Sequence, residues 1–151
     1  MLADPDRLIS EFGTLLGMPG LRLDAQRHCS LLFDRSHRLA IACDSAGGRL
    51  VLHCAVGPLP PAVSSDTLIA LLRANYLWRG AHGATLSLDP DGRQVTLMLA
   101  LSLAGLDTAQ LNTAVEKLLD SVDAWQRFLA DPQRGDPGPA LAPLRFFDMK
   151  A

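Results

Sequence analysis

The most reactive groups in the sequence are two pairs in which a histidine directly precedes a cysteine. His28-Cys29 and His53-Cys54 lie in apolar segments, and Cys43 lies between them. Imidazole and thiolate groups are zinc ligands, and a cysteine beside a histidine can act as a nucleophile. However, adjacent residues on a strand point to opposite faces of a sheet, so each pair offers only one ligand to a given side. There is no Cys-x-x-Cys spacing and no evident third group to orient a catalytic histidine. We therefore expect reduced, buried thiols, with no metal, no cofactor and no catalytic residue.

The common catalytic motifs are absent. The sequence has no Gly-x-Gly-x-x-Gly, no Walker-type phosphate loop, no His-Glu-x-x-His and no nucleophile elbow. Its only glutamates, Glu11 and Glu116, are expected on the surfaces of separate helices, so they do not form an acid–base pair. A small metal- or thiol-dependent enzyme built on the His-Cys pairs remains the alternative from the enzyme class.

Composition and charge exclude several further classes. The chain has 151 residues, of which 48% are hydrophobic, which suits one domain with a real core. Fourteen basic and sixteen acidic residues give a net charge of −2, which argues against nucleic acid or an anionic membrane as a partner. No segment approaches the roughly 18 uninterrupted apolar residues of a membrane span. The first residues carry acids where a secretory signal carries bases, so we expect a cytosolic protein.

Hydrophobic spacing predicts an α+β fold. A helix is expected between Asp4 and Gly17, because Leu8, Phe12 and Leu15 recur at spacings of three and four. The other expected elements are strands near 29–33, 39–43 and 50–56, a helix from 64 to 77, strands at 84–89 and 94–103, and a helix from 108 to 129. Short breaks permit only antiparallel neighbours. The economical arrangement is a single antiparallel five-stranded twisted sheet with three helices.

The C-terminal end differs in composition from the rest. Four of the ten prolines lie past Asp131, and hydrophobic periodicity is weak there. We expect a domain over residues 1–131 and a flexible, Pro-rich tail over 132–151, which could dock through Phe146 and Phe147.

The second expected helix carries more apolar residues than one sheet can cover. Leu68, Leu71 and Leu72 are followed by Tyr76 and Leu77, so well over half of its circumference is apolar. An isolated domain of this size would expose the excess as a contiguous patch, and such patches mark partner sites. This pattern indicates a homodimer, a polypeptide-binding surface, or both.

One segment carries a family resemblance. Residues 72–95, LRANYLWRGAHGATLSLDPDGRQV, place an Asn at a helix end before a Gly-rich exit, a Thr-Leu-x-Leu-Asp strand and a Gly turn. This segment resembles the signature of class I type III secretion chaperones, the Tir-chaperone (CesT-like) family. The run from Leu101 to Asp107, and the helix with Trp125 that follows it, also fit. By element order, the resemblance extends from residue 1 to about 131, although the Pro-rich tail departs from the family.

The resemblance implies a small bacterial cytoplasmic homodimer without enzymatic activity. Such chaperones bind the N-terminal segment of a secreted effector in extended form and keep it secretion-competent. The implied partners are a second copy of the chain, the effector and, as a further partner, the ATPase of the secretion apparatus.

The resemblance also implies two sets of site residues. Family dimers join through the second helix and the following strand, which correspond here to Leu68, Ile69, Leu72, Tyr76, Trp78, Leu86 and Leu88. Effectors lie in apolar grooves between the first helix and the sheet, and often add a strand to the sheet edge. The candidate groove residues are Phe12, Leu16, Leu31, Phe33, Leu39 and Ile41. A third hypothesis is a dimeric adaptor module for a folded partner.

Overall fold

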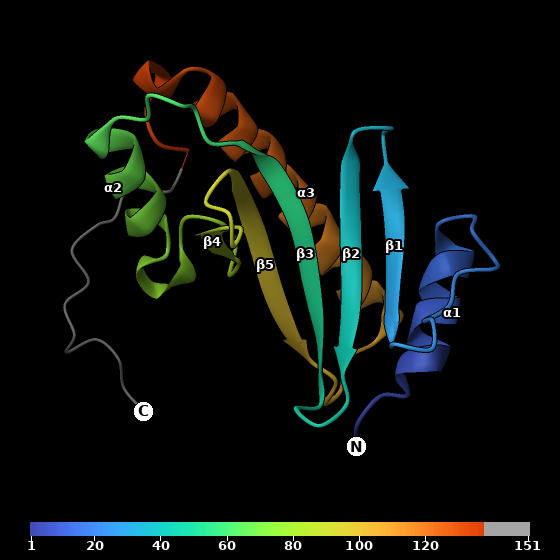
Figure 1. The fold of residues 1–151 in the computed structure, drawn as a ribbon. Coiled ribbons are helices and arrows are strands. Elements are labelled where there is room, and N and C mark those ends of the chain that lie inside the picture. The colour runs from blue at the N-terminus through green and yellow to red at the C-terminus, as the bar shows by residue number, and fades with distance from the viewer. Residues whose placement is uncertain (138–151) are drawn as a thin grey trace, which may run out of the picture.

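The computed structural model describes residues 1–137 and contains one five-stranded antiparallel sheet in the order β1-β2-β3-β5-β4 (Figure 1). The strands are β1 (His28–Phe33), β2 (His37–Asp44), β3 (Arg49–Pro58), β4 (Thr85–Leu88) and β5 (Gln94–Ser102). The helices are α1 (Pro5–Leu15), α2 (Ser65–Ala74) and α3 (Thr108–Ala130), with short 3-10 turns η1 (Tyr76–Trp78) and η2 (Pro132–Arg134). The predicted fold class and element order are therefore confirmed.

Each helix begins at a capping residue. The Asp4 carboxylate accepts from the backbone N–H of Asp6, and Pro5 occupies the first turn of α1. The Ser64 hydroxyl accepts from the N–H of Thr67 at the start of α2. α3 begins with a capping box between Asp107 and Gln110. These bonds satisfy backbone donors that have no partner within the helix.

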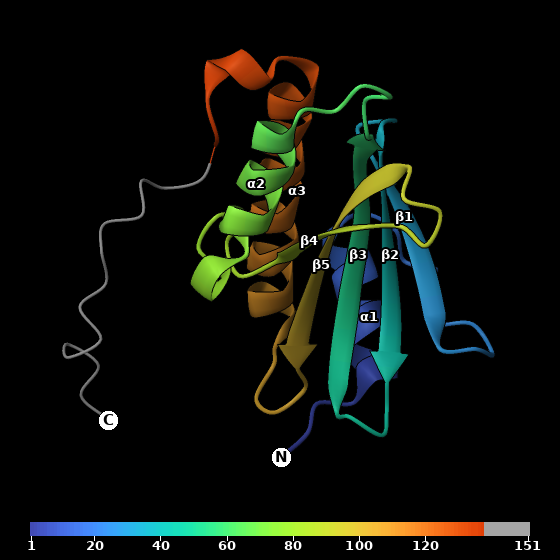
Figure 2. The same ribbon diagram turned by 60° about the vertical axis from the view of Figure 1, so that its left-hand side comes forward.

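The helices α1 and α3 cover one face of the sheet (Figure 2). The predicted apolar stripe of α3 faces the sheet and is buried throughout; it consists of Leu111, Val115, Leu118, Val122, Trp125 and Leu129. Trp125 stacks edge-on against Phe128 with ring centroids 5.3 Å apart. Full burial of one such side chain stabilises the fold by about 1.5–3 kcal/mol, so this face forms the core.

α2 is shorter than the sequence predicts. The helix ends at Ala74, and Leu77 and Trp78 both adopt positive φ values of 53°. The chain then folds back on itself, and the N–H of Gly80 donates to the Ala74 carbonyl at 3.0 Å. A Cβ at Gly80 would lie 2.6 Å from Ala74 Cβ, so only glycine permits this approach.

α3 ends at Ala130, and the boundary between 1–131 and 132–151 stays a prediction. Residues 138–151, including Phe146 and Phe147, lie outside the described residues. In the described part of the chain, we find no helix with the length and apolar character needed to cross a membrane.

Candidate polypeptide-binding surfaces

An exposed apolar surface runs over α2, η1 and β4. We call it the α2 surface; it consists of Leu68, Ile69, Leu72, Tyr76, Leu77, Trp78 and Leu88, all of them exposed. Leu72 is 72% exposed and Trp78 is 58% exposed, values that are high for large side chains in a lone domain. Six of the seven residues predicted for a dimer interface lie in this surface. The seventh, Leu86, is buried.

The α2 surface is hollowed between the helix and the short strand. A cavity of about 230 Å³ lies between α2 and β4. Leu71, Leu86 and Val95 contribute buried side chains to its lining, and Leu72 and Leu88 contribute exposed ones. The cavity is thus an apolar recess within an exposed apolar surface, and large side chains of a partner could fill it.

Asn75 fastens the end of α2 to β4. Its side-chain amide donates to the Leu86 carbonyl at 2.9 Å, and its side-chain oxygen accepts from the Leu86 N–H at 2.8 Å. β4 is an edge strand, and Leu86 lies opposite Leu97 on β5. The backbone N–H and carbonyl of Leu86 bond to Asn75, so they point outward, away from β5. The amide side chain therefore takes the place of a neighbouring strand and closes the outer edge of β4 at this residue.

The loop after η1 is fixed to α3. The Trp125 indole N–H donates to the Gly80 carbonyl at 3.1 Å, and His82 Nδ1 lies 2.7 Å from the Ser121 hydroxyl. One nitrogen of Arg79, Nη1, is buried with no hydrogen-bond partner in the described chain. Leaving a charged donor in this state costs free energy.

The six residues predicted for an effector groove do not line an open surface. Phe12, Leu31, Leu39 and Ile41 are buried in the core beneath α1. Leu16 and Phe33 are half-buried and pack against that core. The structure brings the six together, but as the packing between α1 and the sheet. Hydrophobic spacing cannot separate core residues from groove residues, because both alternate in the same way.

Strand β1 is the open edge on the opposite side of the sheet. The Arg27 carbonyl accepts from Cys43 N–H toward β2, whereas the backbone groups of His28 face outward and bond to Asp24. Because backbone groups alternate along a strand, those of Ser30 and Leu32 also face outward. No strand of the described chain lies beside them. Sequence reasoning did not select Leu32, although its side chain is 57% exposed.

The His-Cys pairs do not converge. His53 and Cys54 point to opposite sides of β3, with Cys54 in the core, and Cys29 is half-buried on β1. Burial raises the pKa of Cys54 to about 11, with a smaller contribution from Asp123. Burial likewise raises the pKa of Cys29 to about 11, so both thiols stay protonated at neutral pH. Within residues 1–137, no cluster of three His, Cys, Asp or Glu side chains could hold a metal ion.

Comparisons with known proteins agree with this fold. The model of the Tir chaperone protein (CesT) family matches residues 7–126. A chain in the crystal structure of the ExsC-ExsE complex superposes with a TM-score of 0.73 and 27% identity, covering 82% of this chain and 92% of that chain. A comparison with curated protein sequences found no match.

Two more distant structures share the fold. One is the Yersinia pestis type III secretion chaperone SycH in complex with a stable fragment of YscM2, with a TM-score of 0.65, 22% identity and coverage of 80% of this chain and 98% of that chain. The other is the ExoU-SpcU heterodimer from the type III secretion system of Pseudomonas aeruginosa, with a TM-score of 0.59, 19% identity and coverage of 84% and 98%.

Proposed function

Because the chain belongs to the Tir chaperone protein (CesT) family, we propose that it is a type III secretion chaperone that binds a secreted effector. The family match carries this function, since it extends over residues 7–126 and so from α1 into the last turns of α3. The chaperone binds the N-terminal segment of the effector in extended form and keeps it competent for secretion. It does so without catalysis or a cofactor, in the bacterial cytoplasm, and delivers the effector to the ATPase of the secretion apparatus.

The edge of β1 supports binding of an extended segment. The outward backbone groups of Ser30 and Leu32 can pair with a client strand of any sequence, and each net hydrogen bond contributes about 0.5–1.5 kcal/mol. The exposed Leu32 and the half-buried Phe33 lie on this edge strand and offer apolar contacts. Phe33 packs against the core that contains the buried members of the predicted groove.

The α2 surface supports a homodimer. A second copy would cover Leu72, Trp78 and their apolar neighbours, which are exposed to solvent in a single subunit. Because Asn75 closes the outer edge of β4 at Leu86, side-chain packing and not strand pairing would hold the two subunits together there.

Co-expression with candidate secreted proteins, followed by protease mapping and hydrogen exchange, tests the function. A chaperone should protect an otherwise disordered client segment of about 50–100 residues, and the client should slow exchange at Ser30 and Leu32. A client that binds only as a folded domain, with no change at β1, would favour the adaptor hypothesis. Stoichiometric zinc in the purified protein would favour the enzyme hypothesis.

A further inference from the structure

A trough lies beside the half of β5 that β4 does not cover. β4 pairs with β5 only at Val95–Met98, and Figure 1 shows β4 alongside one end of the longer strand. From Leu99 to Ser102, β5 has β3 on one side and no strand of the described chain on the other. A hollow of about 440 Å³, which we call the β5 trough, separates this half-strand from the N-terminal half of α3.

The backbone of this half-strand is available for pairing. The N–H of Leu103 donates toward β3 at Gly48, and the Gln94 carbonyl accepts from Asp89 on the β4 side. By alternation, the backbone groups of Ala100 and Ser102 face the β4 side, beyond the end of β4. Both residues are exposed. The sheet therefore has a second short open edge.

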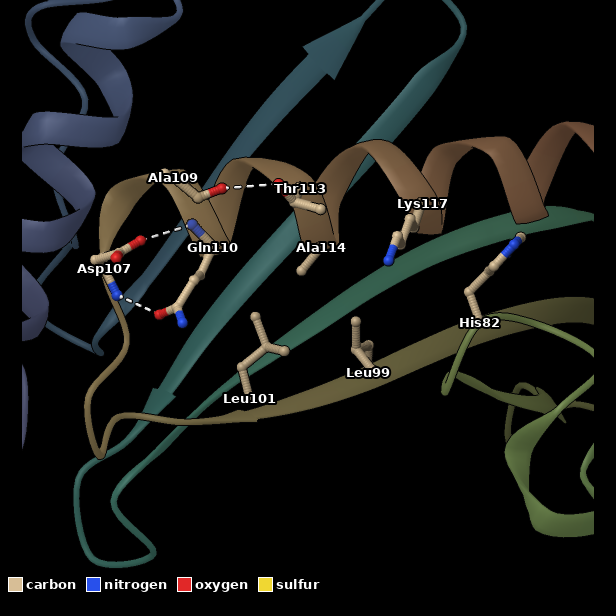
Figure 3. Close-up of a pocket in the computed structure, with 9 residues that line it drawn as sticks. All are labelled: His82, Leu99, Leu101, Asp107, Ala109, Gln110, Thr113, Ala114 and Lys117. Carbon is tan, nitrogen blue, oxygen red and sulfur yellow. Dashed lines mark hydrogen bonds between the residues drawn. The ribbon is translucent and has the colours of Figure 1, made fainter.

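The trough has an apolar floor and polar side chains at both ends, as Figure 3 shows. Leu99 and Leu101 are half-buried and face Ala114 across the hollow. Asp107 lies at one end of the trough, where the capping box occupies its carboxylate. Lys117 and His82 lie at the other end.

The end of the trough at Lys117 and His82 carries donors without an acceptor. Lys117 forms no ion pair with the described residues. His82 is oriented by Ser121 through Nδ1. When the Ser121 hydroxyl donates to Nδ1, Nε2 carries the hydrogen and is a further donor. A carboxylate in the ligand would complement this end of the trough.

We propose that the β5 trough is a second peptide-binding site, which takes an extended apolar segment with one acidic side chain. The segment adds to β5 as a strand at Ala100 and Ser102, places an apolar side chain on Leu99 and Leu101, and sets its carboxylate against Lys117 and His82. This inference rests on the proposed chaperone function, because the occupant is a further extended segment of the effector client. The acidic side chain gives the site a selectivity that main-chain pairing lacks.

Binding of synthetic peptides to the full-length protein tests the proposal. The probe is a seven-residue peptide of alternating Val and Thr with a central Glu, and the matched peptides carry Gln or Lys at that place. The Glu peptide should shift the NMR amide signals of Ala100 and Ser102 and bind about fivefold more tightly than the Gln peptide. In the Lys117→Glu variant the preference should reverse, so that the Lys peptide binds best. Arg127→Glu, an equal charge change on α3 outside the trough residues, should leave the preference unchanged.

Three results would overturn the proposal. They are an absence of Glu preference, signal shifts confined to Ser30 and Leu32 on β1, and concentration-dependent shifts at Ala100 without peptide, which would identify a second copy as the occupant. Peptide shifts at β1 alone, with a client still protected there, would overturn the trough while supporting the chaperone function. Failure of the wild-type protein to bind any co-expressed client would contradict the chaperone function. The peptide measurements would then still test the β5 trough independently.

Discussion

His37 Nε2 lies 2.8 Å from Asp123 Oδ1, a bond between residues that are 86 positions apart in the chain. The Ser36 hydroxyl lies 2.6 Å from the other ring nitrogen of His37. The imidazole, only 11% exposed, thus ties the turn between β1 and β2 to the middle of α3. Because β1 has no strand on its outer side, this tie is one of the few side-chain bonds that hold the edge hairpin against the core.

A double-mutant cycle should measure this tie. His37→Ala and Asp123→Asn should each lower the free energy of unfolding, and the coupling between them should be about 0.5–1 kcal/mol. Urea unfolding of the wild type, both single variants and the double variant gives the value. Asp120→Asn serves as the control, because Asp120 is an exposed carboxylate on the same helix. Strict additivity of the two single changes would show that the bond contributes nothing.

Asn75→Ala should destabilise the protein and free the edge of β4. The change removes both bonds to Leu86, and leaving these backbone groups unpaired should cost about 1–3 kcal/mol. An exposed edge also promotes pairing between chains, so light scattering should detect larger species. Asn112→Ala is the matched control, because Asn112 bonds only to Glu116 on the same exposed helix face. Equal stability of the two variants would show that the bonds of Asn75 to Leu86 do not stabilise the protein.

Local signals in the sequence were sufficient for the order of elements. Asp4, Ser64 and Asp107 cap their helices as their residue types predict, and the stripe that contains Trp125 is buried as its spacing predicts. These features depend on neighbours within a few positions, which a pattern records directly.

Features that depend on distant contacts could not be predicted. The break at Leu77 depends on the bonds of Asn75 to Leu86 and on the approach of Gly80 to Ala74. The groove residues were assigned from the family resemblance, and hydrophobic alternation could not test that assignment because it is the same for a core position and for an open pocket. The β5 trough exists because β4 is much shorter than β5, a difference in length that hydrophobic spacing does not record.

Leu72→Asp should break the proposed dimer. A charge at the most exposed leucine of the α2 surface would be desolvated in the interface. Substitution of a central interface residue of this kind weakens the free energy of association by about 2 kcal/mol or more. Sedimentation should show a monomer or an aggregate in place of a dimer. Leu15→Asp, at an exposed leucine on α1, should leave the dimer intact. A Leu72→Asp protein that sediments as a dimer would place the interface elsewhere.

The thiol of Cys54 should ionise at a higher pH in the folded chain than in the unfolded chain. Its pKa is raised to about 11 by burial, whereas a free thiol ionises near pH 8.5. The neutral thiol therefore contributes stability that is present below about pH 8.5 and is lost as the pH rises toward 11. In a Cys29→Ala, Cys43→Ala variant, thiolate absorbance should rise at higher pH in buffer than in urea. Coincident titrations would contradict the burial of Cys54.

Leu32→Pro should weaken client binding while leaving the fold intact. The N–H of Leu32 faces outward from β1, so proline removes no bond to β2 and its ring is tolerated at a sheet edge. A client strand would lose that main-chain bond and meet the proline ring, which should weaken binding by tenfold or more, about 1.4 kcal/mol.

The matched variant Leu32→Ala separates the main chain from the side chain. It keeps the N–H and removes most of the apolar side chain, so it should weaken client binding less than proline does if strand pairing dominates. Titration calorimetry with the co-expressed client measures both, and circular dichroism confirms that each variant keeps its sheet. Since a client bound by strand pairing cannot tolerate the loss of the edge N–H, wild-type affinity in a folded Leu32→Pro protein would mean that the effector does not add to β1.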